Sequence, residues 1–129
     1  MSHNVPDNLR YTKEDEWIAI DGDVATIGIT DYAQDQLSDI VYLELPDADT
    51  NLEIEEVFGV VESVKAASDV YAPIGGEILD VNTALEDDPS LVNTAPMGDG
   101  WFFTMKASDT SEMDDMMDEA GYNEFVAGL

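Results

Sequence analysis

The stretch from residue 58 to residue 73 reads FGVVESVKAASDVYAP and contains two runs of β-forming residues that meet at Lys65. The first run (57–64) and the second (67–72) are rich in Val and other residues that favour strands. Only Lys65 and Ala66 separate the two runs, so the sequence predicts a tight β-hairpin with Lys65 at its tip. A turn this short directs the tip side chain away from both strands.

A lysine at a hairpin tip has two interpretations. Its ε-amine is a compact nucleophile on a flexible stem that can enter the pocket of another enzyme, which is the geometry needed to acylate it with a swinging-arm cofactor. A solvated turn lysine fits the spacing equally well. Composition favours the first interpretation. The chain has only 4 Lys+Arg against 30 Asp+Glu, so a lysine that is kept in such a chain suggests a specific role. The other lysines, Lys13 and Lys106, are explained as salt-bridge partners or solvated residues.

The composition indicates a folded domain with an acidic surface. The chain has 129 residues and a formal net charge of −26. Leu, Ile, Val and Phe make up about 25% of it, above the roughly 20% below which a highly charged chain reads as disordered. We expect one domain over residues 1–129, with 1–8 flexible. Because molar salt screens repulsion between acidic groups, the acidity indicates adaptation to a very salty cytoplasm.

The same figures exclude several classes of function. A surface this negative repels nucleic-acid phosphates and anionic lipids, and no apolar run approaches the roughly 20 residues of a membrane span. Residues 1–10 lack the apolar segment of a signal peptide, so we expect a cytoplasmic protein. Without cysteine there is no disulfide or thiolate metal site. The acidic loop 47–51 lacks the glycine and glutamate of a calcium-binding EF-hand loop, so we expect no metal site.

The rest of the sequence predicts a mostly β architecture. Residues 16–20 and 24–29 form a hairpin across a turn at 21–23. Thr30 is predicted to cap a short helix that reaches Leu37. Further strands are predicted at 40–45, 77–81 and 101–105.

The C-terminal residues 109–126 have a helical pattern. Asp109 and Glu112 form a capping box, and Gly121 is expected as the C-terminal cap, with residues 122–126 as a further turn. Between them the residues at helical spacing are Met113, Met116, Met117 and Ala120. We expect this methionine stripe to pack against the sheet rather than to bind a partner.

The segment around Lys65 resembles the lipoylation segment of the glycine cleavage system H protein family. The resemblance rests on ESVKAASDVYAP at 62–73, followed by Gly76 and Glu77, and covers about residues 9–126. Further matching blocks are ATIGIT at 25–30, YAQ at 32–34, DIVYLELP at 39–46, PSLVN at 89–93 and GWF at 100–102. It implies a barrel-sandwich hybrid fold of two small antiparallel sheets. It also implies lipoate amide-linked to Lys65, with Glu62, Ser63, Val64 and Ala66 recognised by a lipoate-attaching enzyme.

The resemblance also implies a function without catalysis by the chain itself. Members of the family carry an aminomethyl group from the P protein to the T protein and pass electrons to the L protein. A cleft for the loaded arm is implied at Glu16 and Asp69, where carboxylates pair with the ammonium of the cargo. The chain departs from the family at Glu14-Asp15, where a small hydroxyl residue and a histidine are usual, and Glu14 becomes a candidate third carboxylate. It departs again at Ser38, where glycine is commoner.

Three related carriers are alternatives. A biotin carrier shares the fold but typically flanks its lysine with methionines, whereas Val64 and Ala66 stand here. A lipoyl domain of a 2-oxoacid dehydrogenase acyltransferase usually has aspartate before the lysine. An H-like carrier that serves lipoate assembly or another lipoate-dependent pathway stays open. An independent enzyme finds no support, because the sequence has one histidine, His3, and lacks a phosphate-binding loop or nucleophile elbow.

Overall fold

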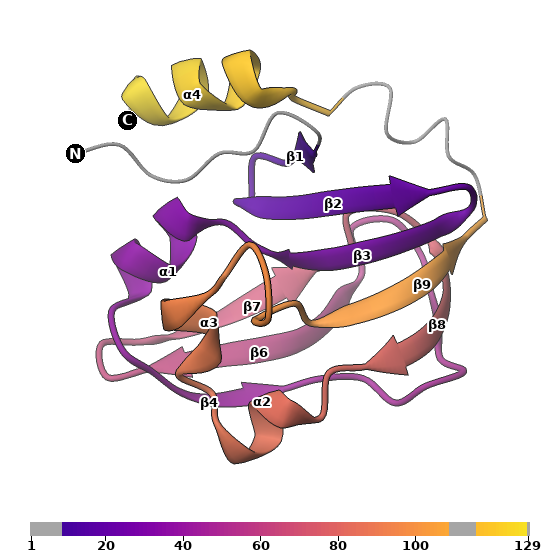
Figure 1. Ribbon diagram of the computed structural model, residues 1–129, viewed down its shortest axis with the longest axis horizontal. Helices are drawn as coiled ribbons and strands as arrows, with labels where there is room; N and C mark the ends of the chain where they lie inside the picture. The colour runs from indigo at the N-terminus through magenta and orange to yellow at the C-terminus, as the bar shows by residue number, and fades with distance from the viewer. Residues whose placement is uncertain (1–8, 109–115, 129) are drawn as a thin grey trace.

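The computed structural model describes residues 9–108 and 116–128 of the chain and arranges them as two antiparallel sheets (Figure 1). The larger sheet has the strand order β1-β2-β3-β9-β8-β5, and the smaller has the order β4-β6-β7. The strands are β1 (Arg10–Tyr11), β2 (Glu16–Asp21), β3 (Val24–Ile29), β4 (Ile40–Glu44), β5 (Asn51–Leu52), β6 (Val57–Ser63), β7 (Ala67–Tyr71), β8 (Gly76–Val81) and β9 (Phe103–Ala107). The helices are α1 (Asp31–Leu37), α2 (Ala84–Asp87), α3 (Leu91–Thr94) and α4 (Glu119–Ala127). The expected mostly β fold with a short helix after the first hairpin is confirmed.

The first hairpin forms as the sequence predicts. Asp21 pairs with Val24, which leaves Gly22 and Asp23 as a two-residue turn. Gly22 has φ 66°, a left-handed conformation that glycine adopts without steric cost. Helix α1 then begins at its predicted cap, because the Thr30 hydroxyl accepts a hydrogen bond of 3.1 Å from the Ala33 amide.

The main core lies between the two sheets. Strands β3, β8 and β9 contribute Ile27, Ile78 and Phe103 from one side, and β6 contributes Val61 from the other; these side chains are at most 1% exposed. The ring of Phe58 meets that of Phe103 edge-on, with centroids 4.8 Å apart. Alternation of buried and exposed residues along the strands therefore fixes which face of each sheet turns inward.

The predicted C-terminal helix is confirmed, but residues 116–118 are not helical and Gly121 is not its C-terminal cap, so these two parts of the prediction are wrong. Helix α4 begins at Glu119, where the Asp118 carboxylate accepts a hydrogen bond of 2.8 Å from the Gly121 amide. Gly121 therefore lies in the first turn, and Gly128 is the C-terminal cap. Met117 is extended because its amide and carbonyl bond the backbone of Tyr11 in an isolated bridge. The expected capping box and Met113 lie outside the described residues; the further turn predicted at 122–126 lies inside α4.

A second, smaller core holds α4 against the N-terminal strands. Tyr122 of α4 stacks on Tyr11 of β1 with ring centroids 4.7 Å apart, and both are fully buried with Trp17 nearby. Figure 1 shows α4 beside β1, on the side of β2 that faces away from the smaller sheet. Met116 packs against the main core and Met117 against this second one, as expected for packing rather than for a free methionine face.

Four short elements were not predicted: β1, β5, α2 and α3. Each has two or four residues. Segments this short have too few positions to show the spacing of apolar residues that marks a strand (a period of two) or a helix (a period of 3.6). Among the described residues, no helix has the length and apolarity needed to cross a membrane.

Candidate functional site

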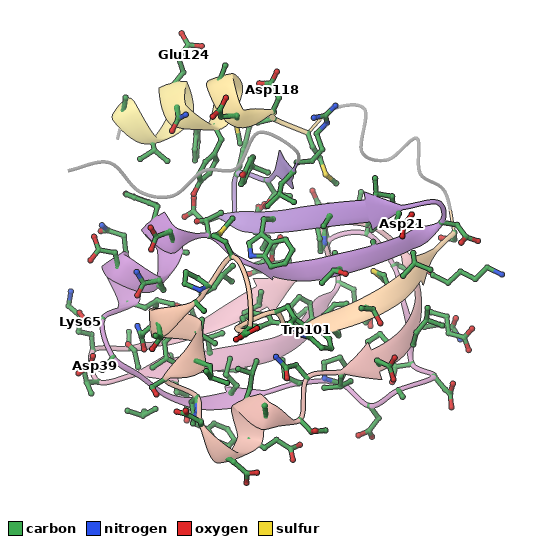
Figure 2. The ribbon with its side chains drawn as sticks, viewed as in Figure 1. Asp21, Asp39, Lys65, Trp101, Asp118 and Glu124 are labelled. Carbon is green, nitrogen blue, oxygen red and sulfur yellow. The ribbon has the colours of Figure 1, made fainter. Side chains whose placement is uncertain are left out.

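Lys65 lies at the tip of the β6–β7 hairpin. Glu62 pairs with Ala67, and the Ser63 amide donates a 2.8 Å hydrogen bond to the Ala66 carbonyl, which closes the turn. The Lys65 side chain is exposed, and its Nζ lies 3.5 Å from the carbonyl oxygen of Gln36, at the outer limit for a hydrogen bond. Figure 2 shows its amine at the edge of the molecule, directed away from the sheets. This geometry leaves the amine accessible.

Ser63 fixes the conformation of the tip. Its hydroxyl oxygen accepts hydrogen bonds of 3.2 Å from the amides of Lys65 and Ala66. The Val64 amide donates to the Asp39 carbonyl at 3.0 Å, which ties the turn to the segment that enters β4. Hydroxyl-to-backbone bonds of this kind satisfy turn amides that have no ladder partner. The backbone under Lys65 is therefore held, and only the side chain is left to swing.

The residues beside Lys65 are accessible to a recognising enzyme. Val64 is 65% exposed, a large exposure for an apolar side chain. Glu62 and Ala66 are exposed as well, and Ser63 is half-buried. The four residues expected to flank the modification site thus surround the lysine on one hairpin end.

Glu16 is buried, although it is the first residue of β2. Its side chain is 1% exposed and lies on the same face of β2 as Ile18, which belongs to the main core. Oε1 accepts a hydrogen bond of 3.1 Å from the Thr12 hydroxyl, and Oε2 accepts one of 2.9 Å from the Tyr71 amide. The carboxyl group therefore joins the edge of β7 to the turn that precedes β2.

Burial changes the ionisation of this carboxyl group. Removal from water raises the pKa of Glu16 to about 8, while the hydrogen bonds from Tyr71 and Thr12 act in the opposite direction. The neighbouring charges of Glu14 and Asp15 raise the pKa further. At neutral pH the group is mostly a neutral acid, and a cation beside it would favour the ionised form.

A cavity of about 340 Å³ opens beside Glu16. Its polar rim is formed by Thr12, Lys13, Glu14, Glu16 and Glu55. Its apolar wall includes Ile54, Tyr71, Ala72, Pro73, Met116 and Met117. An apolar chain with a cationic end fits such a lining, because the lining has an apolar part and holds three glutamates against one lysine.

The predicted cleft residues are only partly brought together. Glu14 and Glu16 line the cavity, whereas Asp69 does not; it is exposed on β7, two residues before Tyr71 and on the same side of the strand. Tyr71 follows Lys65 by six positions, which corresponds to about 20 Å at ~3.3 Å per residue. Asp69 therefore lies along the strand between the lysine and the cavity.

Two contacts of the site were missed by the sequence reasoning. Thr12 supplies a hydroxyl to Glu16, although the position before Asp15, where the family usually has one, holds Glu14. Asp15 has φ 64° and accepts a 2.9 Å hydrogen bond from Tyr122, which is 107 residues away in the chain. The four-residue spacing of Thr12 and Glu16 is a local pattern that could have indicated the first contact, but nothing local indicates the second.

Comparisons with known proteins agree with this arrangement. The family model described as Glycine cleavage H-protein matches residues 9–128. A glycine cleavage system H protein from Parvibaculum lavamentivorans is 52% identical over 122 residues, which cover 95% of this chain and 98% of that protein. A probable glycine cleavage system H protein from Haloarcula marismortui is 51% identical, over 98% of this chain and 99% of that protein.

A solved structure shares the fold as well. The crystal structure of a glycine cleavage system H protein from Mycobacterium marinum superimposes with a TM-score of 0.87 at 34% sequence identity, covering 97% of this chain and 100% of that chain. With a tip lysine, a buried acid and these relatives, the chain belongs to the glycine cleavage H-protein family, the non-catalytic lipoyl carriers of the glycine cleavage system.

Proposed function

We propose that Lys65 carries the lipoyl group as an amide on Nζ. On this arm the chain moves an aminomethyl group from the P protein to the T protein and electrons to the L protein. The observation that supports the proposal is the exposed amine on a turn whose backbone is fixed by Ser63. When bound, lipoate supplies the dithiolane chemistry of transfer and reoxidation, and the chain supplies its attachment.

The fixed turn gives the arm a defined origin. Because the backbone at Lys65 is hydrogen-bonded to Ser63 and, through Val64, to Asp39, the swinging motion is confined to the side chain. A tethered group reaches a high effective concentration at each partner site that its length can span. A lipoate-attaching enzyme first needs access to the same lysine, and the exposed Val64, Glu62 and Ala66 provide that surface.

We place the resting position of the cargo at the cavity beside Glu16. The ammonium of an aminomethyl group would lie among Glu16, Glu14 and the Thr12 hydroxyl, with the apolar wall excluding water. Its charge favours ionisation of Glu16, so a neutral acid in the free protein becomes a paired carboxylate in the loaded one. Asp69, exposed on β7 between Lys65 and the cavity, offers the ammonium a carboxylate along the path to this resting position.

The attachment site is tested by intact mass spectrometry of the protein expressed in a host that carries out lipoylation. The expected result is one lipoyl adduct, which is lost in Lys65→Ala. Lys106→Ala is the matched control, because Lys106 is also an exposed lysine but lies on β9 and not at a hairpin tip. An adduct that persists in Lys65→Ala, or disappears in Lys106→Ala, would place the modification elsewhere.

The carrier cycle is tested by reconstitution with the P, T and L proteins. Lipoylated protein is expected to support release of carbon dioxide and transfer of the one-carbon unit, whereas unmodified protein or Lys65→Ala supports neither. Lipoylated protein that accepts no cargo from the P protein would assign the arm to a different lipoate-dependent pathway. The cytoplasm, where these partners would be met, remains the expected location.

A further inference from the structure

We infer that Tyr122 of the C-terminal helix is a positioning residue for the cargo cavity. It acts through Asp15 on the turn from Thr12 to Glu16, which forms the polar rim of that cavity. The inference rests on the proposed function, since it assigns a role in holding the arm's resting site.

The Tyr122 hydroxyl completes a directed chain of hydrogen bonds. It donates to Asp15 Oδ1 at 2.9 Å and lies 2.7 Å from the Thr30 hydroxyl, which in turn accepts from the Ala33 amide at 3.1 Å. Because the Tyr122 hydroxyl donates its proton to Asp15, the Thr30 hydroxyl is the donor in the bond between the two hydroxyls. Both hydroxyls and Asp15 Oδ1 then have hydrogen-bond partners, and Tyr122 and Thr30 are at most 1% exposed.

Asp15 needs this support because of its backbone conformation. Its φ of 64° lies in the left-handed region, which is disfavoured for residues other than glycine and tolerated best by Asn and Asp. The backbone there is held by two hydrogen bonds, from the Asp15 amide to the Thr12 carbonyl at 3.1 Å and from the Thr30 amide to the Asp15 carbonyl at 2.8 Å. The Tyr122 bond fixes the side chain as well.

The turn held in this way carries the contacts of Glu16. The Thr12 amide donates to the Glu16 carbonyl at 3.0 Å, and the Thr12 hydroxyl donates to Oε1 of the same residue. Lys13 and Glu14, between them, line the cavity rim. Without the Tyr122 hydroxyl, the half-buried Asp15 carboxylate loses its partner and is expected to turn toward water, which releases the turn and moves the Thr12 hydroxyl away from Glu16.

The C-terminal segment contributes to the cavity in a second way. Met116 and Met117 form part of the apolar wall, and Met117 is fixed by its two backbone bonds with Tyr11, of 2.8 and 2.9 Å. Tyr122 stacks on the same Tyr11 ring. Residues 116–122 therefore supply part of the cavity wall through Met116 and Met117 and hold the turn of its polar side through Tyr122.

The test is the variant Tyr122→Phe, which keeps the ring stacked on Tyr11 and removes only the hydroxyl. Tyr42→Phe is the matched control, since Tyr42 is 51% exposed on β4 and touches neither the network nor the cavity lining. The first readout is the pH titration of the Tyr71 amide resonance by NMR, because this amide donates to Glu16. Glu14 and Asp15 raise the pKa of Glu16, Lys13 and Glu55 line the same cavity, and all four are present in both variants.

In Tyr122→Phe the Tyr71 titration midpoint is expected to move upward, because Thr12 no longer stabilises the ionised carboxylate. Tyr42→Phe is expected to titrate as the unmodified protein does. Asp15→Asn keeps an acceptor for Tyr122 and removes the charge that raises the pKa of Glu16, so its midpoint is expected at or below that of the unmodified protein, and a midpoint above it would contradict the positioning role. An unchanged midpoint in Tyr122→Phe, with α4 still helical by circular dichroism, overturns the inference whether or not any cargo is bound.

A second readout separates this inference from the proposed function. Hydrolytic loss of the aminomethyl cargo from lipoylated protein, followed as released formaldehyde, is expected to accelerate about fivefold in Tyr122→Phe, as for one lost hydrogen bond. Faster loss in Glu16→Gln with no change in Tyr122→Phe refutes the positioning role and leaves the cavity's role intact. No change in Glu16→Gln refutes the cavity's role, and the Tyr71 titration then decides the positioning role by itself.

Discussion

Glu16→Gln should change how the stability of this protein depends on pH. The pKa of Glu16 is raised from 4.5 to about 8 by burial. Below pH 4.5 the group is neutral in both the folded and the unfolded state, so Glu16 does not lower the free energy of unfolding there. As the pH rises toward 8, the folded state keeps a proton that the unfolded state has lost. The free energy of unfolding therefore falls over this window, and above it the dependence on Glu16 ends.

The size of this effect follows from the same shift. One pKa unit corresponds to ~1.4 kcal/mol, so the slope contributed by Glu16 is a loss of about 1.4 kcal/mol per pH unit, and the whole window amounts to about 5 kcal/mol. Glu16→Gln keeps the shape and the acceptor oxygen of the side chain but cannot ionise. Its stability relative to the unmodified protein should therefore rise steadily with pH.

The assay is equilibrium urea unfolding at one fixed molar salt concentration, from about pH 5 to about pH 9. Glu77→Gln serves as the control, because Glu77 is an exposed carboxylate on β8. The difference between the unmodified protein and Glu16→Gln should grow across the window, and the difference for Glu77→Gln should stay flat. Parallel pH profiles for all three proteins would refute the assignment of a neutral, buried acid at this site.

Three further outcomes are expected. Thermal unfolding should occur at lower temperature in dilute buffer than in molar salt, because the Debye length falls from about 10 Å at 0.1 M to about 3 Å at 1 M; an unchanged Tm would contradict adaptation to salt. Gly59→Ala should destabilise the fold by about 3 kcal/mol in urea unfolding, since its Cβ would lie 1.9 Å from the Glu44 carbonyl oxygen and force β4 from β6. Gly98→Ala, whose Cβ would meet open space, should leave stability unchanged, and equal effects of the two would argue against the steric reason. Thr12→Val should raise the pKa of Glu16 further, seen in the Tyr71 amide titration, and an unaltered titration would remove Thr12 from the site.

Local pattern was sufficient for most of the strands. The hairpin at Gly22, the cap at Thr30 and the tip at Lys65 all depend on residues within a few positions of one another, and the structure confirms each of them. The C-terminal helix was also predicted, but its extent around Met117 was wrong for the opposite reason. Met117 fits a helical period, but its backbone hydrogen bonds go to Tyr11, so a partner distant in the sequence decides its conformation.

The candidate site divides in the same way. The family, the tip lysine and the residues around it could be predicted from the order of residues alone, because a two-strand hairpin is specified by neighbouring residues and its turn. The burial of Glu16 and its raised pKa, its bond from the Thr12 hydroxyl and the position of Asp69 outside the cavity lining became visible in the folded chain. Burial and pKa depend on what the fold places around a group, and Glu16 meets the amide of Tyr71, which lies 55 residues later in the chain.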